Sequence, residues 1–315
     1  DVELIVADCA STDRTASICE RERERNIRFE YVPAPGDDLL RGLAAGADYA
    51  RGRYIMPMRP ADWFGAGLLE SMAAAIASHE PDLLIPSQSL DSYSGKDHER
   101  SSSVTAFETT FWTSSAAFRD AVSDLISLGV LDSPYGMLMK AELARTVLCG
   151  DDAAPVLDSV FQGLSSVTDA GVLAGPAYHV TVPDRSVAAP FDPSRFAHCE
   201  DIYRAWLSTY DAWGYAHDDE RMDAVHHRFL MEVVRCIDNA CIGQSSISSI
   251  ERTQRVQDMV DSDATRSALA HMSAQARALG VMYKPMVRRN AQGCCIGSRL
   301  REIARISHIP MTPNV

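Results

Sequence analysis

The chain has 315 residues, 46% of them hydrophobic, so it can bury a sizeable core in one large domain or in a domain with an appendage. Its formal net charge of −13 argues against nucleic acid or an anionic membrane as the main partner. No apolar run approaches the roughly 18 residues that a membrane span needs. The eight cysteines form no Cys-x-x-Cys pair, which favours reduced thiols in a cytosolic protein.

The first 85 residues alternate between apolar runs and helical patterns. Strands are expected at 2–8, 27–33, 53–58 and 82–87, and helices at 11–25, 37–50 and 65–80. This alternation predicts an α/β fold whose mainly parallel sheet is flanked by helices. Ligands bind beyond the carboxyl ends of strands in such sheets, so the loops after Ala7 and Met58 are the expected site.

The remaining chain changes character twice. The serine-rich segment 87–103 is predicted to be a mobile surface loop. Between residues 115 and 186, helices are expected at 115–129 and 155–167, a strand followed by a helix at 133–146, and a strand at 175–186. From about Pro193 the pattern is helical to the end, with an apolar stripe over 222–240. We therefore expect an α/β domain at 1–190 and an all-helical C-terminal region at 191–315.

Five segments stand in an order that is typical of one enzyme family. They are LIVADCASTDRT (4–15), GADYARGRYIMPMRPADWFGAGLLESM (46–72), SPYGMLMKAEL (133–143), VLDSVF (156–161) and AYHVTVPDRS (177–186). In order and spacing they resemble motifs of family 2 glycosyltransferases of the bacterial polysaccharide type. In the second segment the positions in register with the family are Gly46, Ala50, Gly52, Tyr54, Ile55, Asp62 and Trp63.

The resemblance implies a GT-A (Rossmann-like) fold and transfer of a sugar from a nucleotide-diphosphate donor to an acceptor hydroxyl in cell-surface glycan synthesis. A carboxylate must take the acceptor proton, and positive charge must stabilise the departing diphosphate. In the family that charge is commonly Mg or Mn held by an Asp-x-Asp motif. The implied roles are base for Asp158, nucleotide and donor binding for Asp8, Arg59 and Asp62, and the acceptor side for Tyr135 and Lys140.

The sequence departs from the family at several chemical positions. Arg59 and Ala61 stand at the two metal-motif aspartates, which leaves Asp62 as the remaining metal candidate and argues against a metal cofactor. The other departures are Cys9 and Ala10 in the first motif, Leu43 and Ala44 where Arg-Asn is common, Leu157 before Asp158, and Thr181 in place of an arginine.

These departures leave alternatives open for each candidate. Asp158 is a base or a surface carboxylate, and Asp8 reads the nucleotide or caps the following helix. Asp62 binds a metal or caps a turn. Arg59 grips a diphosphate without a metal, or it is a solvated residue of a decayed site.

At the level of the whole protein, the main alternative to an active enzyme is a catalytically inactive GT-A module that serves as a scaffold or partner. A nucleotidyltransferase-like protein is disfavoured, because the first turn lacks a glycine- and lysine-rich phosphate loop.

The family usually places one more strand before the first motif, inside the sheet. The sequence therefore predicts an upstream extension of about thirty residues, the size of a βαβ unit. The expected partners are a nucleotide-sugar donor and a glycan or lipid-linked acceptor, with no nucleic acid. A homo-oligomer would form through the C-terminal helices. The expected location is cytoplasmic, and the basic segment 286–305 allows peripheral contact with the inner membrane face as a weaker alternative to a solvated helix.

Overall fold

The computed structural model describes residues 1–34, 36, 39–94, 99–131, 133–148, 163–182, 190–242, 247–272 and 275–306. The chain divides into two compact units. The first comprises Asp1–Asp91, Ser102–Val122 and Leu131–Thr181, and the second comprises Ser92–Ser101, Ser123–Val130 and Val182–Val315. The boundary expected at residue 190 stays a prediction.

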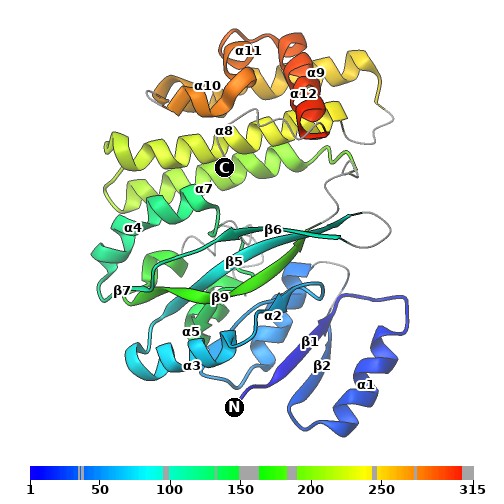
Figure 1. Ribbon diagram of the computed structural model, residues 1–315, viewed down its shortest axis with the longest axis vertical. Helices are drawn as coiled ribbons and strands as arrows, with labels where there is room; N and C mark the ends of the chain where they lie inside the picture. Colours follow the sequence, from blue (N-terminus) through cyan, green and yellow to red (C-terminus); the bar gives the residue numbers. More distant parts are fainter. Residues whose placement is uncertain are drawn as a thin grey trace. The chain divides into compact units, whose positions relative to one another are not determined.

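The first unit opens with a small parallel sheet. Strands β1 (Leu4–Asp8) and β2 (Phe29–Pro33) pair in parallel, from Leu4 opposite Phe29 to Asp8 opposite Pro33, and helix α1 (Thr15–Arg25) connects them. Helix α2 (Leu39–Tyr49) packs closely on β1, because a Cβ added at Gly46 would lie 3.6 Å from the Cβ of Ala7. Figure 1 shows these two strands as a ribbon of their own beside α1.

The larger sheet, most of which belongs to this unit, has seven strands in the order β3-β8-β5-β9-β4, with β6 paired to β5 and β7 paired to β9. The strands are β3 (Tyr54–Ile55), β4 (Trp63–Phe64), β5 (Leu83–Ser94), β6 (Glu99–Thr105), β7 (Thr110–Trp112), β8 (Leu138–Lys140) and β9 (Ala170–Val182). Helices α3 (Leu68–His79), α4 (Ser115–Leu128) and α5 (Ala141–Leu148) connect them.

The expected α/β fold and the first four strands are confirmed, but the strand directions differ from the expectation of a mainly parallel sheet. The pairs β3–β8, β5–β8, β4–β9 and β7–β9 are antiparallel. The reason is that β8 and β9, which come from later in the chain, supply the neighbours of the early strands. A helical crossover makes only its own two strands parallel, as it does for β1 and β2.

The prediction of a loop over residues 87–103 is wrong, because most of this segment forms β5 and β6. Ser87, Ser89 and Asp91 are 1%, 1% and 0% exposed, so the inward positions of β5 are polar. A strand with polar side chains on its buried face resembles a loop in composition. Beside it, the apolar core contains Leu68, Met72, Leu84, Leu173 and Tyr178.

The second unit is mainly helical, as expected. Its helices are α7 (Arg195–Ala212), α8 (Asp219–Ile242), α9 (Ser249–Asp261), α10 (Asp263–His271), α11 (Tyr283–Val287) and α12 (Ala291–Ile306), with the 3-10 segment Gln275–Met282 before α11. Figure 1 shows α7 and α8 side by side. The stripe on α8 is confirmed as core, since Val225, Phe229, Val233 and Ile237 are all at most 3% exposed.

Among the helices described, none combines the length and apolarity needed to cross a bilayer. The described cysteines are free thiols.

Candidate functional site

The turn after β3 holds an internal ion pair. The chain leaves β3 through Met56 and Met58, which pack against the core, and turns so that the Asp62 amide donates to the Arg59 carbonyl at 3.0 Å. Arg59 Nε donates to Asp62 Oδ2 and Arg59 Nη2 donates to Asp62 Oδ1, both at 3.0 Å. This bidentate geometry is the strongest form of an arginine–carboxylate pair.

The Asp62 carboxylate accepts two further hydrogen bonds from β9. Tyr178 Oη donates to Oδ2 at 2.6 Å, and the Thr181 amide donates to Oδ1 at 3.1 Å. Pairing of Phe64 with Tyr178 in β4–β9 sets this geometry. Burial, followed by the bond to Asp62, raises the pKa of Tyr178, so its hydroxyl keeps its proton and acts as a donor. Asp62 is thus a buried anchor with four donors.

Tyr135 lies over the same arginine. The Arg59 guanidinium carbon is 5.6 Å from the centre of the Tyr135 ring. The next residue, Gly136, holds Tyr135 there by donating its amide to the Pro57 carbonyl at 2.9 Å. Burial raises the pKa of the Tyr135 hydroxyl, although the positive charge of Arg59 acts against this rise.

Asp8 closes the carboxyl end of β1 and is 8% exposed. Its Oδ1 accepts from the Ser11 amide at 3.1 Å, and its Oδ2 accepts from Tyr31 Oη at 2.7 Å. Hydrogen bonds from the Ser11 side chain and from Tyr31 lower the pKa of Asp8, and the bond to Asp8 raises the pKa of Tyr31 to about 12. Asp8 therefore orders the turn after β1, and contact with a nucleotide base stays a prediction. Asp13 accepts from the Thr15 amide at 2.9 Å at the start of α1.

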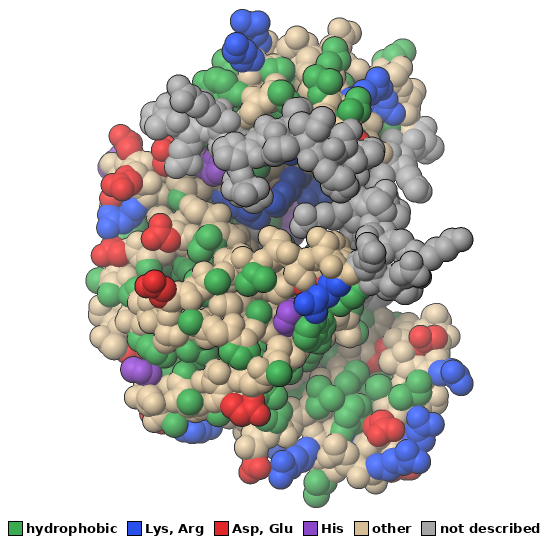
Figure 2. Space-filling view, in the orientation of Figure 1, with side chains coloured by type: hydrophobic (Ala, Val, Ile, Leu, Met, Phe, Trp, Pro, Cys, Tyr) green, Lys and Arg blue, Asp and Glu red, His purple; other side chains and the backbone are tan. Residues whose placement is uncertain are grey.

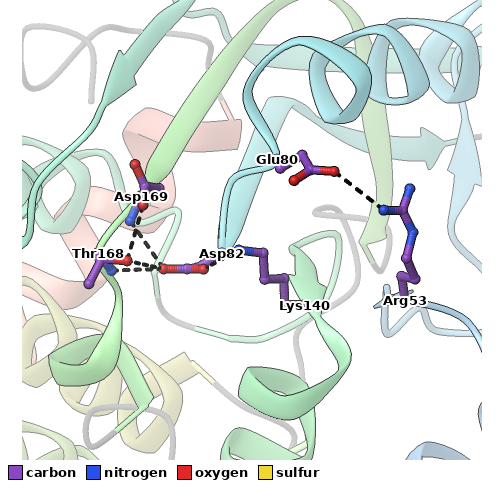
Figure 3. A network of polar contacts seen from close by, with 6 residues as sticks. All are labelled: Arg53, Glu80, Asp82, Lys140, Thr168 and Asp169. Atoms are coloured by element: carbon purple, nitrogen blue, oxygen red, sulfur yellow. Dashed lines mark hydrogen bonds and ion pairs between the residues drawn. The ribbon is translucent and has the colours of Figure 1, made fainter.

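Lys140 belongs to a different cluster, at the other end of β3. It pairs in register with Tyr54, the first residue of β3, and its Nζ donates to Asp82 Oδ1 at 2.7 Å. Asp82 Oδ2 accepts from the amides of Thr168 and Asp169 at 2.9 and 3.1 Å (Figure 3). The structure thus brings Arg59, Asp62 and Tyr135 together and separates Lys140 from them.

The proposed base, Asp158, and its neighbour Leu157 lie outside the described residues. The base role therefore stays a prediction. Its alternative, a surface carboxylate, stays open as well.

Sequence reasoning missed a second polar cluster on the opposite side of β9 from Tyr178. His179 Nδ1 lies 2.8 Å from Asp91 Oδ2, and the His179 ring stacks on Trp63 with 3.5 Å between the ring centres. Burial opposes ionisation of Asp91, but hydrogen bonds from Ser102, Ser89 and His179 lower its pKa. A carboxylate and a stacked ring together fix the imidazole orientation. The signal in the sequence was the alternation of Ser87, Ser89 and Asp91, which marks one face of a strand.

A divalent metal does not fit the turn after β3. Each Asp62 oxygen already accepts two bonds, and a carboxylate offers about four lone-pair sites in all. A neighbouring arginine also repels a cation. Over the described ranges, no group of three or more His, Cys, Asp or Glu side chains could hold a metal ion. In the second unit, His226 Nδ1 lies 2.8 Å from Tyr203 Oη, so this imidazole nitrogen is engaged in a hydrogen bond.

Comparison with solved structures identifies the fold of this molecule. The structure is similar to a crystal structure of S. aureus TarS 1-349, with 15% identity, a TM-score of 0.54 and coverage of 96% of this chain and 82% of that chain. The same fragment in complex with UDP-GlcNAc gives 16% identity, a TM-score of 0.53 and coverage of 96% and 83%. A longer TarS structure, of which 49% is covered, gives 14% identity over 94% of this chain and a TM-score of 0.52. These likenesses show that the fold is of the GT-A type.

The family follows from the sequence of the N-terminal part. Residues 1–144 match the family model described as "Glycosyl transferase family 2". This match confirms the resemblance to family 2 glycosyltransferases over the N-terminal part of the chain. A comparison with curated protein sequences gives no match.

Proposed function

We propose that this protein transfers a sugar from a nucleotide-diphosphate sugar to a hydroxyl of a cell-surface glycan or lipid-linked acceptor. The observation that carries the proposal is the family match over residues 1–144, which spans β1, β3 and the turn with Arg59 and Asp62. The first donor to test is UDP-GlcNAc, because TarS 1-349, which has a similar fold, was crystallised with it.

The proposed reaction is a displacement at the anomeric carbon of the donor. The acceptor oxygen attacks this carbon, Asp158 takes the acceptor proton, and the bond to the diphosphate breaks with its electron pair leaving on the diphosphate. In this scheme Asp8 lies toward the nucleotide and Arg59 toward the diphosphate. Tyr135 lies on the acceptor side, whereas Lys140 is paired with Asp82 in a separate cluster.

The test is release of nucleoside diphosphate from a panel of nucleotide sugars, with water or a glycan as acceptor. We expect turnover of at least one donor and a fall of about 10²- to 10⁴-fold in Asp158→Asn, the usual contribution of a general base. If Asp158→Asn keeps full turnover, Asp158 is not the base, although the protein is still an enzyme.

One observation favours the alternative of an inactive module. Asp62 is fully engaged by Arg59, Tyr178 and Thr181, so the turn is stable without a ligand. An inactive module would bind none of the nucleoside diphosphates and turn over none of the panel.

We also propose that α12 contributes to a homo-oligomer. Ile296, Leu300 and Ile303 recur at helical spacing and are 60%, 47% and 59% exposed. Light scattering of the wild type and of Leu300→Glu tests this, and a monomeric wild type would contradict it.

Free thiols favour the proposed cytoplasmic location.

A further inference from the structure

We propose that the donor diphosphate is held by the guanidinium of Arg59 without a divalent cation, and that Asp62 anchors Arg59 instead of binding a metal. This inference rests on the proposed function and specifies how the same site recognises its donor. It concerns the family's metal motif, where this chain has Arg59 and Ala61.

The first step concerns the carboxylate. The Asp62 side chain is 0% exposed, and its four acceptor positions are taken by Arg59 twice, by Tyr178 and by Thr181. A metal at Asp62 would have to displace a charge-assisted bond from Arg59 or a bond from a buried tyrosine. Displacing either would leave a buried donor without an acceptor, which is costly.

The second step concerns the arginine. A guanidinium has five N–H donors, and two of those of Arg59 are used by Asp62. Its side chain is 37% exposed, so Arg59 remains accessible to solvent although it is paired with Asp62. The Asp62 carboxylate fixes one edge and the Tyr135 ring lies over the plane, so Arg59 is oriented before a ligand arrives. A fixed guanidinium edge suits two phosphate oxygens.

The third step concerns charge. A divalent cation and the two carboxylates that hold it have together roughly no net charge before the diphosphate binds. Arg59 with Asp62 also sums to zero. The pair therefore reproduces the charge balance of a metal site, while the cation is covalently part of the chain.

The experiment is calorimetric titration of the protein with UDP, and with GDP and dTDP in parallel, once in EDTA and once in MnCl₂. The variants are Arg59→Lys, which keeps the charge but loses the planar fork, and Arg53→Lys as the matched control. Arg53 precedes β3 in the same unit, and its pair with Glu80 is solvent-exposed on both sides (Figure 3).

We expect the affinity for one of the three nucleotides to be the same in EDTA and MnCl₂. Arg59→Lys should weaken binding by about tenfold or more, as expected when a bidentate charge-assisted bond is lost. Arg53→Lys should bind like the wild type. Thermal unfolding of each variant shows that the changes in affinity do not come from lost folding.

Three results would overturn the inference, and they can be told apart. Binding that needs manganese, or that is unaffected by Arg59→Lys, refutes the metal-free arginine site and leaves the proposed function standing. Absence of binding to all three nucleotides in both conditions refutes the inference together with the proposed donor class.

Discussion

Asp62 shows how one residue can change roles when its neighbours change. In a metal-binding turn a carboxylate faces outward to a cation, whereas here it is buried and accepts bonds from Arg59, Tyr178 and Thr181. Of the residues that donate to Asp62, only Arg59 lies close to it in the sequence, three residues away. The two other donors come from β9, more than one hundred residues along the chain.

Removal of this carboxylate should destabilise the protein strongly. We expect Asp62→Ala to lower the free energy of unfolding by about 3 kcal/mol, because a buried guanidinium edge and the Tyr178 hydroxyl lose their acceptor. Asp62→Asn, which keeps one acceptor oxygen, should cost less. Urea denaturation measures both, and a loss below about 1 kcal/mol in the alanine variant would mean that solvent replaces the carboxylate.

Asp82 gives the fold a dependence on acid. Burial works against its ionisation, but bonds from Lys140, Thr168 and Asp169 bring its pKa to about 2, below the model-peptide value of 3.8. Because the folded pKa is the lower one, Asp82 stabilises the fold above pH 4, and this contribution is lost as the pH falls toward 2.

The expected size of this effect is about 2 kcal/mol, from about 1.4 kcal/mol per pKa unit. Urea denaturation between pH 5 and pH 2 should show a shallower decline for Asp82→Asn than for the wild type. Glu80→Gln, in the exposed pair with Arg53, serves as the control and should follow the wild type. Parallel declines in the wild type and Asp82→Asn would show that other carboxylates control acid unfolding.

At the scale of elements, β9 organises the candidate site. Tyr178 and the Thr181 amide hold Asp62, and the Thr181 hydroxyl donates to the Ala61 carbonyl at 2.5 Å. On the other face of the same strand, His179 meets Asp91 and Trp63. One strand thus fixes the turn after β3 and the polar side of β5.

The turn before β8 depends on a glycine. Gly136 has a φ of +80°, and a Cβ there would lie 2.6 Å from the Tyr178 ring. We expect Gly136→Ala to destabilise the protein by about 2 kcal/mol or more, because left-handed strain adds to overpacking. Thermal unfolding provides the measurement.

Gly214 offers a matched control, because it has the same φ of +80° and no atom within 4 Å of an added Cβ. Its alanine variant should lose only about 1 kcal/mol, from the backbone alone. Equal losses at the two positions would show that the Tyr178 ring yields to the new methyl group.

At the scale of the molecule, the sequence predicted where the helices and strands lie better than it predicted which strands pair and in which direction. Apolar periodicity located β1, β2, β3, α3 and α8, because each pattern depends on local burial. Strand directions depend on pairings between distant segments, such as β4 with β9, which periodicity does not encode. The family motifs located the turn at Arg59, but its closure by Tyr178 is a long-range contact that no motif records.

Charge is also a property of the whole chain. On the face drawn in Figure 2, Asp and Glu side chains are scattered among basic and apolar ones, not gathered into one patch. The net charge of −13 therefore does not by itself mark a binding surface on that face.

The two-stranded sheet of β1 and β2 is separate from the larger sheet and can open independently of it. A two-stranded sheet is only marginally stable by itself, so we expect it to open locally while β5 and β9 stay closed. Hydrogen–deuterium exchange should then be at least about tenfold faster in peptides covering 4–8 and 29–33 than in those covering 83–87 and 170–174. Equal rates would mean that the ribbon opens only with its whole unit. If this sheet does open first, the loop that begins at Asp8 opens locally with it. A nucleotide bound at this loop would then slow its hydrogen exchange.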